Sequence, residues 1–228
     1  MKRLLPVLLA ALMLALLQAP PAVAGPRADQ ARLNELRCNA GPVDGVVGAH
    51  TRSAVLRFQS RHGWRQTGSL TRGQRSRLHA TTARRCDRRP VPARSGTGRR
   101  IVLSQGQNWI WLVGPRGRVL AQGGIIDNPR VLAKGSYATR SYCGRAARIR
   151  WNTTATGSVH MQNFVRFAPC GIGFHRIPTW SVRGAQIHPN WYLGTNLDAS
   201  HGCIRVTRAM SFRIWDFTAT RRTPVRVV

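Results

Sequence analysis

The strongest chemical signal in this chain is the six-residue run Ser200-His201-Gly202-Cys203-Ile204-Arg205. A cysteine reacts as its thiolate, and a nearby imidazole favours that form. The glycine directly before Cys203 permits positive φ and lets the backbone approach a substrate closely. The run therefore predicts an accessible, activated thiol. The alternative is a buried structural cysteine beside a glycine turn.

A cysteine nucleophile needs a base that takes its proton and a third group that orients the base. His175 and His188 both precede the six-residue run and compete for the role of base. Backbone N–H groups at Gly202 and Cys203 are the expected donors to an oxyanion, because such donors must point at the oxygen that gains charge. The residues alone leave the choice of histidine open.

The six-residue run resembles the Ser/Thr-His-Gly-Cys-Ile/Val/Leu-Arg/Asn signature of the L,D-transpeptidase catalytic domain. Gly173-Phe174-His175-Arg176-Ile177-Pro178 resembles the family segment that carries the partner histidine. The resemblance covers roughly residues 100 to 228 and includes Gly194-Thr195. It departs at Lys134-Gly135-Ser136-Tyr137, where the family commonly has Thr-Pro-Thr-Gly.

The resemblance implies roles for individual residues. It makes Cys203, His175 and His201 catalytic, with the His175 ring oriented by the backbone carbonyl of Arg176. A serine is common at the position of Arg176, so any hydroxyl contribution there is missing. Residues implied near the oxyanion or the substrate are Gly202, Ser200, Arg205 and Arg176, and His188 stays as the alternative base. Structural pairing is the alternative reading of Arg205.

By resemblance, the substrate is a peptidoglycan stem peptide. Cys203 would attack the carbonyl before the terminal D-alanine of a tetrapeptide, expel D-alanine, and pass the acyl group to a neighbouring stem as a 3→3 cross-link. Transfer to water would make the same site an L,D-carboxypeptidase. Two further alternatives are a non-catalytic wall-binding protein and a zinc site built from His175 or His188 with His201 and Cys203. We expect no cofactor and no metal.

Residues 1–24 have the three-part layout of a secretory signal peptide. Lys2 and Arg3 precede an apolar stretch from Leu4 to Leu17, and Ala22-Val23-Ala24 forms a small-x-small cleavage site. The apolar stretch is shorter than the 18 or more residues typical of a membrane span. We therefore expect a secreted protein at the cell wall, with no stable membrane span after cleavage. A retained N-terminal anchor is the alternative.

The chain is strongly basic, with 36 Lys and Arg against 7 Asp and Glu and a formal net charge of +29. Such a charge implies polyanionic surroundings. Nucleic acid is the usual first candidate, but the export signal argues against it. Anionic cell-wall polymers and peptidoglycan carboxylates fit better. We expect a monomer.

Export also changes how the five cysteines are interpreted, because disulfides persist in oxidising compartments. Cys38, Cys86, Cys143 and Cys170 can pair, which leaves Cys203 as the odd thiol. Domain boundaries favour Cys38 with Cys86 and Cys143 with Cys170. The alternative is that these four cysteines are reduced and buried.

The chain divides into a helical part and a strand-rich part. Residues 29–83 contain apolar positions at helical spacing and a capping-box pattern, Thr71 with Gln74, which predict a small helical domain. The run Asp44-Gly45-Val46-Val47-Gly48, with Thr51, Ala54-Val55 and Phe58-Gln59 after it, resembles the three-helix peptidoglycan-binding domain. Residues 84–99 are rich in Arg, Pro and Gly and predict a solvated linker. Residues 100–228 carry short apolar runs broken by Gly, Pro and Asn.

The predicted fold class is α+β. The catalytic domain is expected to be mainly β, a sandwich or closed sheet with one short helix, and the N-terminal domain to be all-α with three helices. Strands are predicted over 101–103, 109–113, 118–121, 159–167, 171–177 and 224–228, with a hairpin turn at 114–117 and a helix over 210–217.

Overall fold

The structure, a computed structural model, describes residues 25–154 and 156–228, with only the backbone of Cys170. The signal peptide predicted for residues 1–24 lies outside the described residues. Within the described part, no helix combines the length and the apolar character that a membrane crossing requires.

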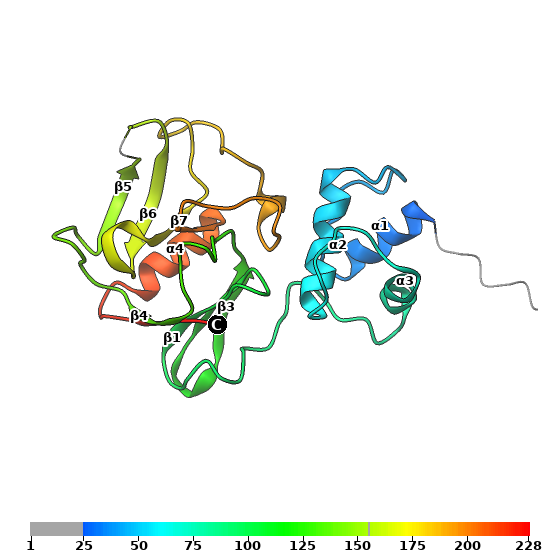
Figure 1. Cartoon of the computed structure of the whole chain (residues 1–228), viewed down its shortest axis with the longest axis horizontal. Coiled ribbons are helices and arrows are strands. Elements are labelled where there is room, and N and C mark those ends of the chain that lie inside the picture. The colour runs from blue at the N-terminus through cyan, green and yellow to red at the C-terminus, as the bar shows by residue number, and fades with distance from the viewer. Residues whose placement is uncertain (1–24, 155) are drawn as a thin grey trace, which may run out of the picture.

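The N-terminal part consists of three helices, α1 (Pro26–Glu35), α2 (Ala49–Arg61) and α3 (Arg72–His79) (Figure 1). The predicted capping box is present at the start of α3, where Thr71 accepts the Gln74 N–H and the Gln74 side chain accepts the Thr71 N–H. The predicted Cys38–Cys86 disulfide is confirmed, and both cysteines are buried in the core of these helices. The disulfide thus ties the end of the helical part to the loop after α1.

Two sheets build the C-terminal part. A five-stranded sheet has the order β3-β2-β1-β9-β4, and a four-stranded sheet has the order β5-β6-β7-β8. The strands of the first sheet are β1 (Arg100–Ser104), β2 (Trp109–Val113), β3 (Val119–Gly124), β4 (Gly135–Ala138) and β9 (Pro224–Val227). Those of the second are β5 (Arg148–Thr153), β6 (His160–Arg166), β7 (Gly173–Arg176) and β8 (Ile204–Val206).

Helix α4 (Arg208–Phe217) contacts β6 and β7 of one sheet and β3 of the other. Apolar residues from both sheets and from α4 form one continuous buried core. Burying the apolar faces of two sheets against each other and a helix is the usual source of stability for such a domain. The predicted α+β class, with a mainly β domain after a three-helix domain, is confirmed.

Three strands escaped the sequence analysis. β4 and β5 lie at sheet edges, and β8 is only three residues long. The β5 sequence carries Arg148 and Arg150, whose guanidinium groups lie over the Trp215 ring. An edge strand needs backbone pairing on one side only, so its sequence can stay polar and its apolar signal weak.

The segment 84–99, predicted as a solvated linker, contains no helix or strand, and a few of its side chains pack against the rest of the chain. Arg89 is 3 % exposed, and its guanidinium lies over the Trp109 ring of β2. Ser95 is fully buried and accepts a hydrogen bond from Arg100. Long cationic side chains can pack their stems on apolar surface, which is how this arginine-rich stretch adheres to the sheet.

The helical part contacts the strand-rich part through α2. Arg57 is buried and donates to the carbonyls of Cys38, Trp191 and Leu193, at 2.7, 2.5 and 3.2 Å. His50 stacks on Trp191 with ring centroids 5.1 Å apart. The two parts are therefore held together through the 3-10 turn η3 (Asn190–Tyr192), which belongs to the long segment before the cysteine.

Candidate active site

Cys203 lies directly before β8 and faces a cavity of about 470 Å³. Its Sγ donates a hydrogen bond to the Gly171 carbonyl at 3.3 Å. Apolar and cationic side chains share this cavity, and its other lining residues are Arg145, Ala146, Ile149, Asn152, Thr153, Met161, Phe164, Arg166 and Gly171. Among the described cysteines, Cys203 is free and half-buried. The odd thiol expected from the sequence thus reaches a cavity.

Gly202 is required by the local backbone. Its φ is +118°, and a Cβ built there would lie 2.8 Å from Val131 Cγ1. Its N–H donates to the Ser200 Oγ at 3.0 Å. The Cys203 N–H, in contrast, makes no hydrogen bond to the described residues. Of the two amides expected as oxyanion donors, only that of Cys203 is therefore unoccupied.

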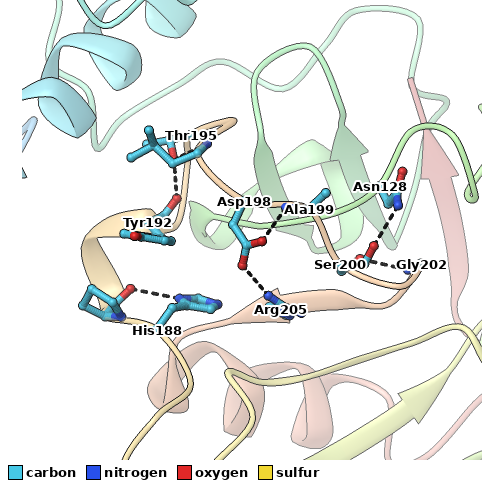
Figure 2. A network of polar contacts seen from close by, with 11 residues as sticks. Asn128, His188, Tyr192, Thr195, Asp198, Ala199, Ser200, Gly202 and Arg205 are labelled. Atoms are coloured by element: carbon cyan, nitrogen blue, oxygen red, sulfur yellow. Dashed lines mark hydrogen bonds and ion pairs between the residues drawn. The ribbon is translucent and has the colours of Figure 1, made fainter. Parts of the chain in front are cut away.

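Residues 126–128, which the sequence analysis did not single out, hold the loop before Cys203 in place through hydrogen bonds. The Ser200 N–H donates to the Asp127 carbonyl at 3.2 Å, and the Asn128 side chain donates to the Ser200 carbonyl at 2.8 Å (Figure 2). Ile126 and Arg205 exchange two backbone hydrogen bonds. The only sequence signal at this place is the Asn128-Pro129 pair, which favours a turn. Ser200 therefore holds the loop in position.

His175 lies on β7, which runs parallel to β8 and pairs His175 with Arg205. The His175 ring stacks on Phe164, a cavity-lining residue, with ring centroids 6.1 Å apart. Its Nδ1 contacts the Arg176 carbonyl at 2.6 Å. A carbonyl can only accept, so Nδ1 carries the proton and the neutral ring keeps a lone pair on Nε2. This is the orienting contact that the resemblance implied.

Burial keeps both candidate groups neutral. It lowers the pKa of His175 to about 4, and the charge of Arg205 acts in the same direction, while the bond to Arg176 opposes it. Burial raises the pKa of the Cys203 thiol, against the effects of a Gly173 backbone hydrogen bond, Arg166 and Arg205. At pH 7 the thiol and the imidazole are therefore uncharged, whereas the sequence led us to expect a pre-formed thiolate.

His188, the alternative base, occupies a separate position. It is buried, stacks on Tyr192 at 5.3 Å between centroids, and its Nδ1 donates to the Pro189 carbonyl at 3.1 Å (Figure 2). Burial lowers its pKa, with a further decrease from Arg205 and an increase from Asp198. Neither histidine lines the Cys203 cavity. His175 lies on the strand that pairs with β8 and stacks on the cavity-lining Phe164, and His188 does neither, which favours His175 as the base.

Arg205 forms an ion pair with Asp198 at 2.6 Å (Figure 2). Its side chain is 9 % exposed and that of Asp198 is 35 % exposed. The structural pairing considered as an alternative for Arg205 is therefore present. The same guanidinium acts on the pKa of Cys203 and of His175, so Arg205 also sets the electrostatics of the site.

Two of the predicted site residues have side chains outside the Cys203 cavity lining. His201 is exposed. Arg176 follows His175 on β7, so its side chain points to the opposite face of the sheet; it lines a different cavity, which does not include Cys203. Only the backbone carbonyl of Arg176 serves His175.

Arg166 is a site residue that the sequence analysis did not assign. It is 2 % exposed, lies over the Phe164 ring at 5.0 Å, and lines the Cys203 cavity. Its Nη1 is buried and has no partner among the described residues. A single arginine in a chain with this many arginines carries no signal in the sequence, so only the fold could reveal it.

The remaining cysteine and metal predictions fare as follows. Cys143 is disulfide-bonded, but its pairing with Cys170 stays a prediction, because the Cys170 side chain lies outside the described part of the structure. Among the described residues, no three His, Cys, Asp or Glu side chains gather in a way that would hold a metal ion. This gives the zinc alternative no support.

Two family models match the chain. Residues 123–227 match the L,D-transpeptidase catalytic domain, and residues 26–78 match the peptidoglycan binding domain. No curated protein matches the chain.

Solved structures with similar folds include three L,D-transpeptidases. That of Xylanimonas cellulosilytica is 21 % identical with a TM-score of 0.49 and covers 89 % of this chain and 92 % of its own. That of Stackebrandtia nassauensis is 15 % identical with a TM-score of 0.44, covering 90 % and 92 %. That of Mycobacterium smegmatis is 16 % identical with a TM-score of 0.44, covering 58 % and 59 %. The likeness rests on the two family models, which match residues 26–78 to a peptidoglycan binding domain and residues 123–227 to the L,D-transpeptidase catalytic domain.

Proposed function

We propose that this protein is an exported cysteine acyltransferase that cross-links peptidoglycan stem peptides, with Cys203 as nucleophile and His175 as base. The observation that carries the proposal is a free thiol in a cavity, beside a strand whose buried histidine has its ring fixed by a backbone carbonyl. The match to the L,D-transpeptidase catalytic domain supplies the reaction class.

The first half-reaction transfers a proton and forms a thioester. The neutral His175 Nε2 accepts the thiol proton as Cys203 Sγ attacks the carbonyl before the terminal D-alanine. The Cys203 N–H stabilises the developing oxyanion, since a pre-oriented donor costs no reorganisation as the charge forms. The tetrahedral intermediate then collapses, and the C–N bond to D-alanine breaks. His175 returns its proton to the leaving amine.

The second half-reaction decides between two activities. An amine of a neighbouring stem attacks the thioester, loses its proton to His175 and forms the 3→3 cross-link, with the thiol restored. Water in place of the amine gives L,D-carboxypeptidase activity at the same site. The cavity of about 470 Å³ has an apolar wall from Ile149, Met161 and Phe164, which favours a peptide acceptor over bulk water.

Arg145 and Arg166 suit an anionic substrate. Both line the Cys203 cavity, and the buried Arg166 Nη1 has no partner among the described residues. Stem peptides carry free carboxylates, and guanidinium groups bind carboxylates with two parallel hydrogen bonds. We assign Arg166 to substrate binding on this basis. His201 is exposed two residues before the thiol, and we assign it to substrate contact rather than to proton transfer.

Residues 26–78 would keep the enzyme on the wall, because they match a peptidoglycan-binding domain. The high positive charge adds attraction to anionic wall polymers. We also propose that residues 1–24 direct export of the protein, which would place it at the cell wall. A catalytically silent wall-binding protein remains the competing function, and it differs in requiring no reactive thiol.

The test is the intact mass of the protein after incubation with a carbapenem, an acylating agent for cysteine enzymes of this family. We expect one adduct on the wild type, none on Cys203→Ala, and slower formation on His175→Ala. His188→Ala is the matched control, because it removes a buried histidine that stacks on Tyr192 rather than on the cavity-lining Phe164. Absence of an adduct on folded, thiol-titrated wild type would reject the acyltransferase and leave the wall-binding function. Equal rates for His175→Ala and wild type would reject the assigned base.

A further inference from the structure

A second cavity, of about 480 Å³, lies on the other face of the four-stranded sheet. It is lined by Trp151, Gln162, Arg176, Val182, Arg183 and Arg208 and shares no residue with the Cys203 cavity. Trp151 and Gln162 are cross-strand partners on β5 and β6. Because His175 and Arg176 are consecutive on β7, their side chains point to opposite faces. The second cavity is therefore separate from the proposed catalytic site.

The charge of this cavity is unbalanced. Three of its six described lining residues are arginines, and none is acidic. The ion pairs of the described residues do not involve Arg176, Arg183 or Arg208. Burial lowers the pKa of Arg176, and the charge of Arg208 lowers it further. Placing like charges together without a counter-ion costs free energy, which an anion in the cavity would recover.

The hydrogen-bonding groups of the cavity are also unused. The buried Arg176 Nε has no partner, and the guanidinium groups of Arg183 and Arg208 make no hydrogen bond to the described residues. Guanidinium N–H groups can only donate, so an acceptor is needed to satisfy them. Buried polar groups in proteins are normally hydrogen-bonded. The unsatisfied donors around this cavity indicate a ligand with several acceptor oxygen atoms.

We propose that this cavity binds an oxyanion, a phosphate or carboxylate group carried by a larger molecule. The half-buried Arg176 and the amide N–H groups of the buried Gln162 form the base, and the exposed Arg183 and Arg208 form the rim. Trp151, 42 % exposed, supplies a flat apolar wall on which a sugar ring or an alkyl chain attached to the anion can pack. The site holds its ligand on the sheet face opposite His175, so both cavities can be filled at once.

The test is calorimetric titration of the full chain with pyrophosphate and, in a second arm, with citrate. We expect saturable binding of at least one anion, weakened about tenfold or more in Arg183→Ala/Arg208→Ala, since charge-assisted hydrogen bonds are among the stronger ones. The arm that binds more tightly identifies the ligand group as phosphate or carboxylate. The anion should also quench tryptophan fluorescence in the wild type. Loss of this quenching in Trp151→Phe would place the anion beside Trp151.

The matched control is Arg65→Ala/Arg72→Ala, which removes the same charge from exposed positions in the helical part. We expect its affinity to stay within about twofold of the wild type, because long-range contributions are screened at moderate salt. If both double variants lose the same affinity for the anion, binding depends on net charge alone, and the proposed site is overturned. Absence of saturable binding by either anion would overturn it too. Neither outcome bears on Cys203, whose acylation is measured separately.

Discussion

At the scale of single residues, the site depends on two features that the backbone imposes. Gly202 adopts a φ of +118° that other residues rarely reach. His175 is held by the Arg176 carbonyl, which fixes the tautomer that leaves Nε2 as the proton acceptor. The Gly202 conformation places the Cys203 thiol at the cavity. The fixed tautomer lets the neutral His175 ring act as a base.

Gly202→Ala is expected to slow acylation of Cys203 by about a hundredfold, because a displacement near 1 Å at the nucleophile has an effect of that size. The added Cβ would meet Val131 Cγ1 at 2.8 Å, and the φ is strained for alanine. Stopped-flow acylation measures the rate. Gly106→Ala is the control, because it has open space and no positive φ. If Gly202→Ala/Val131→Ala regained the full rate, steric contact alone would be responsible.

The thiol of Cys203 should be neutral at pH 7 and become reactive as the thiolate forms at higher pH. Because burial raises the pKa of Cys203 and lowers that of His175 to about 4, alkylation by iodoacetamide should accelerate steadily above pH 8, without a plateau at neutral pH. Mass spectrometry of the free cysteine follows the rate. A plateau between about pH 5 and 8 is the signature of a pre-formed ion pair and would contradict the expectation.

At the scale of elements, the segment between His188 and Arg205 determines the environment of the thiol. It carries η3, the stacked His188 and Tyr192, and Asp198, whose carboxylate pairs with Arg205 (Figure 2). The parallel pairing of β7 and β8 then brings Arg205 beside His175. The sequence spacing between the base and the thiol gives no hint of this arrangement, because it results from long-range strand pairing.

Asp198→Asn is expected to lower the free energy of unfolding by about 1–3 kcal/mol, because it leaves the buried Arg205 without its counter-charge. It should also lower the pKa of His188, which Asp198 raises. Urea unfolding and NMR titration measure the two effects. Asp87→Asn is the control, because its pair with Arg85 is exposed on both sides and contributes less than about 1 kcal/mol. Equal losses in the two variants would refute the role of burial.

At the scale of the whole molecule, the helical part and the catalytic part share an interface centred on Arg57 (Figure 1). Burial lowers the pKa of this guanidinium to about 10, so it remains charged at pH 7. Its acceptors are backbone carbonyls of both parts and the Ser53 hydroxyl. The helical part is thereby fixed to the segment that surrounds the proposed active site.

Arg57→Ala is expected to destabilise the chain by about 3 kcal/mol or more, since several buried carbonyls lose their donor at once. Unfolding of the two parts should also separate into two transitions in calorimetry. Arg52→Ala, an exposed position on the same helix, serves as control and should change stability by less than about 0.5 kcal/mol. A single, unshifted transition for Arg57→Ala would contradict this coupling.

Stability should fall as the pH decreases from about 6.5 to 4. His175 and His62 are held neutral in the fold, with pKa values lowered to about 4 mainly by burial, so the unfolded chain binds more protons in this range. Asp127 acts in the opposite sense, because burial raises its pKa to about 6 and the folded state keeps its proton. The loss of stability from the two histidines exceeds the gain from the one carboxyl group. Urea midpoints at pH 7, 5 and 4 test this, and a rise toward pH 4 would contradict it.

The sequence by itself determined the order of the domains, most strands, the capped helix α3, the Cys38–Cys86 disulfide and the free thiol at Cys203. These follow from local signals: periodicity, caps, cysteine parity and short motifs. The sequence left the choice between His175 and His188 open. Tertiary structure alone decided that Gly202 has lost its free amide to Ser200, that Asn128 supports the loop and that Arg166 enters the cavity. It also decided that the thiol and imidazole are neutral and that Arg176 faces away. Burial, strand register and long-range contacts cause these outcomes, and none of them has a local signature in the sequence.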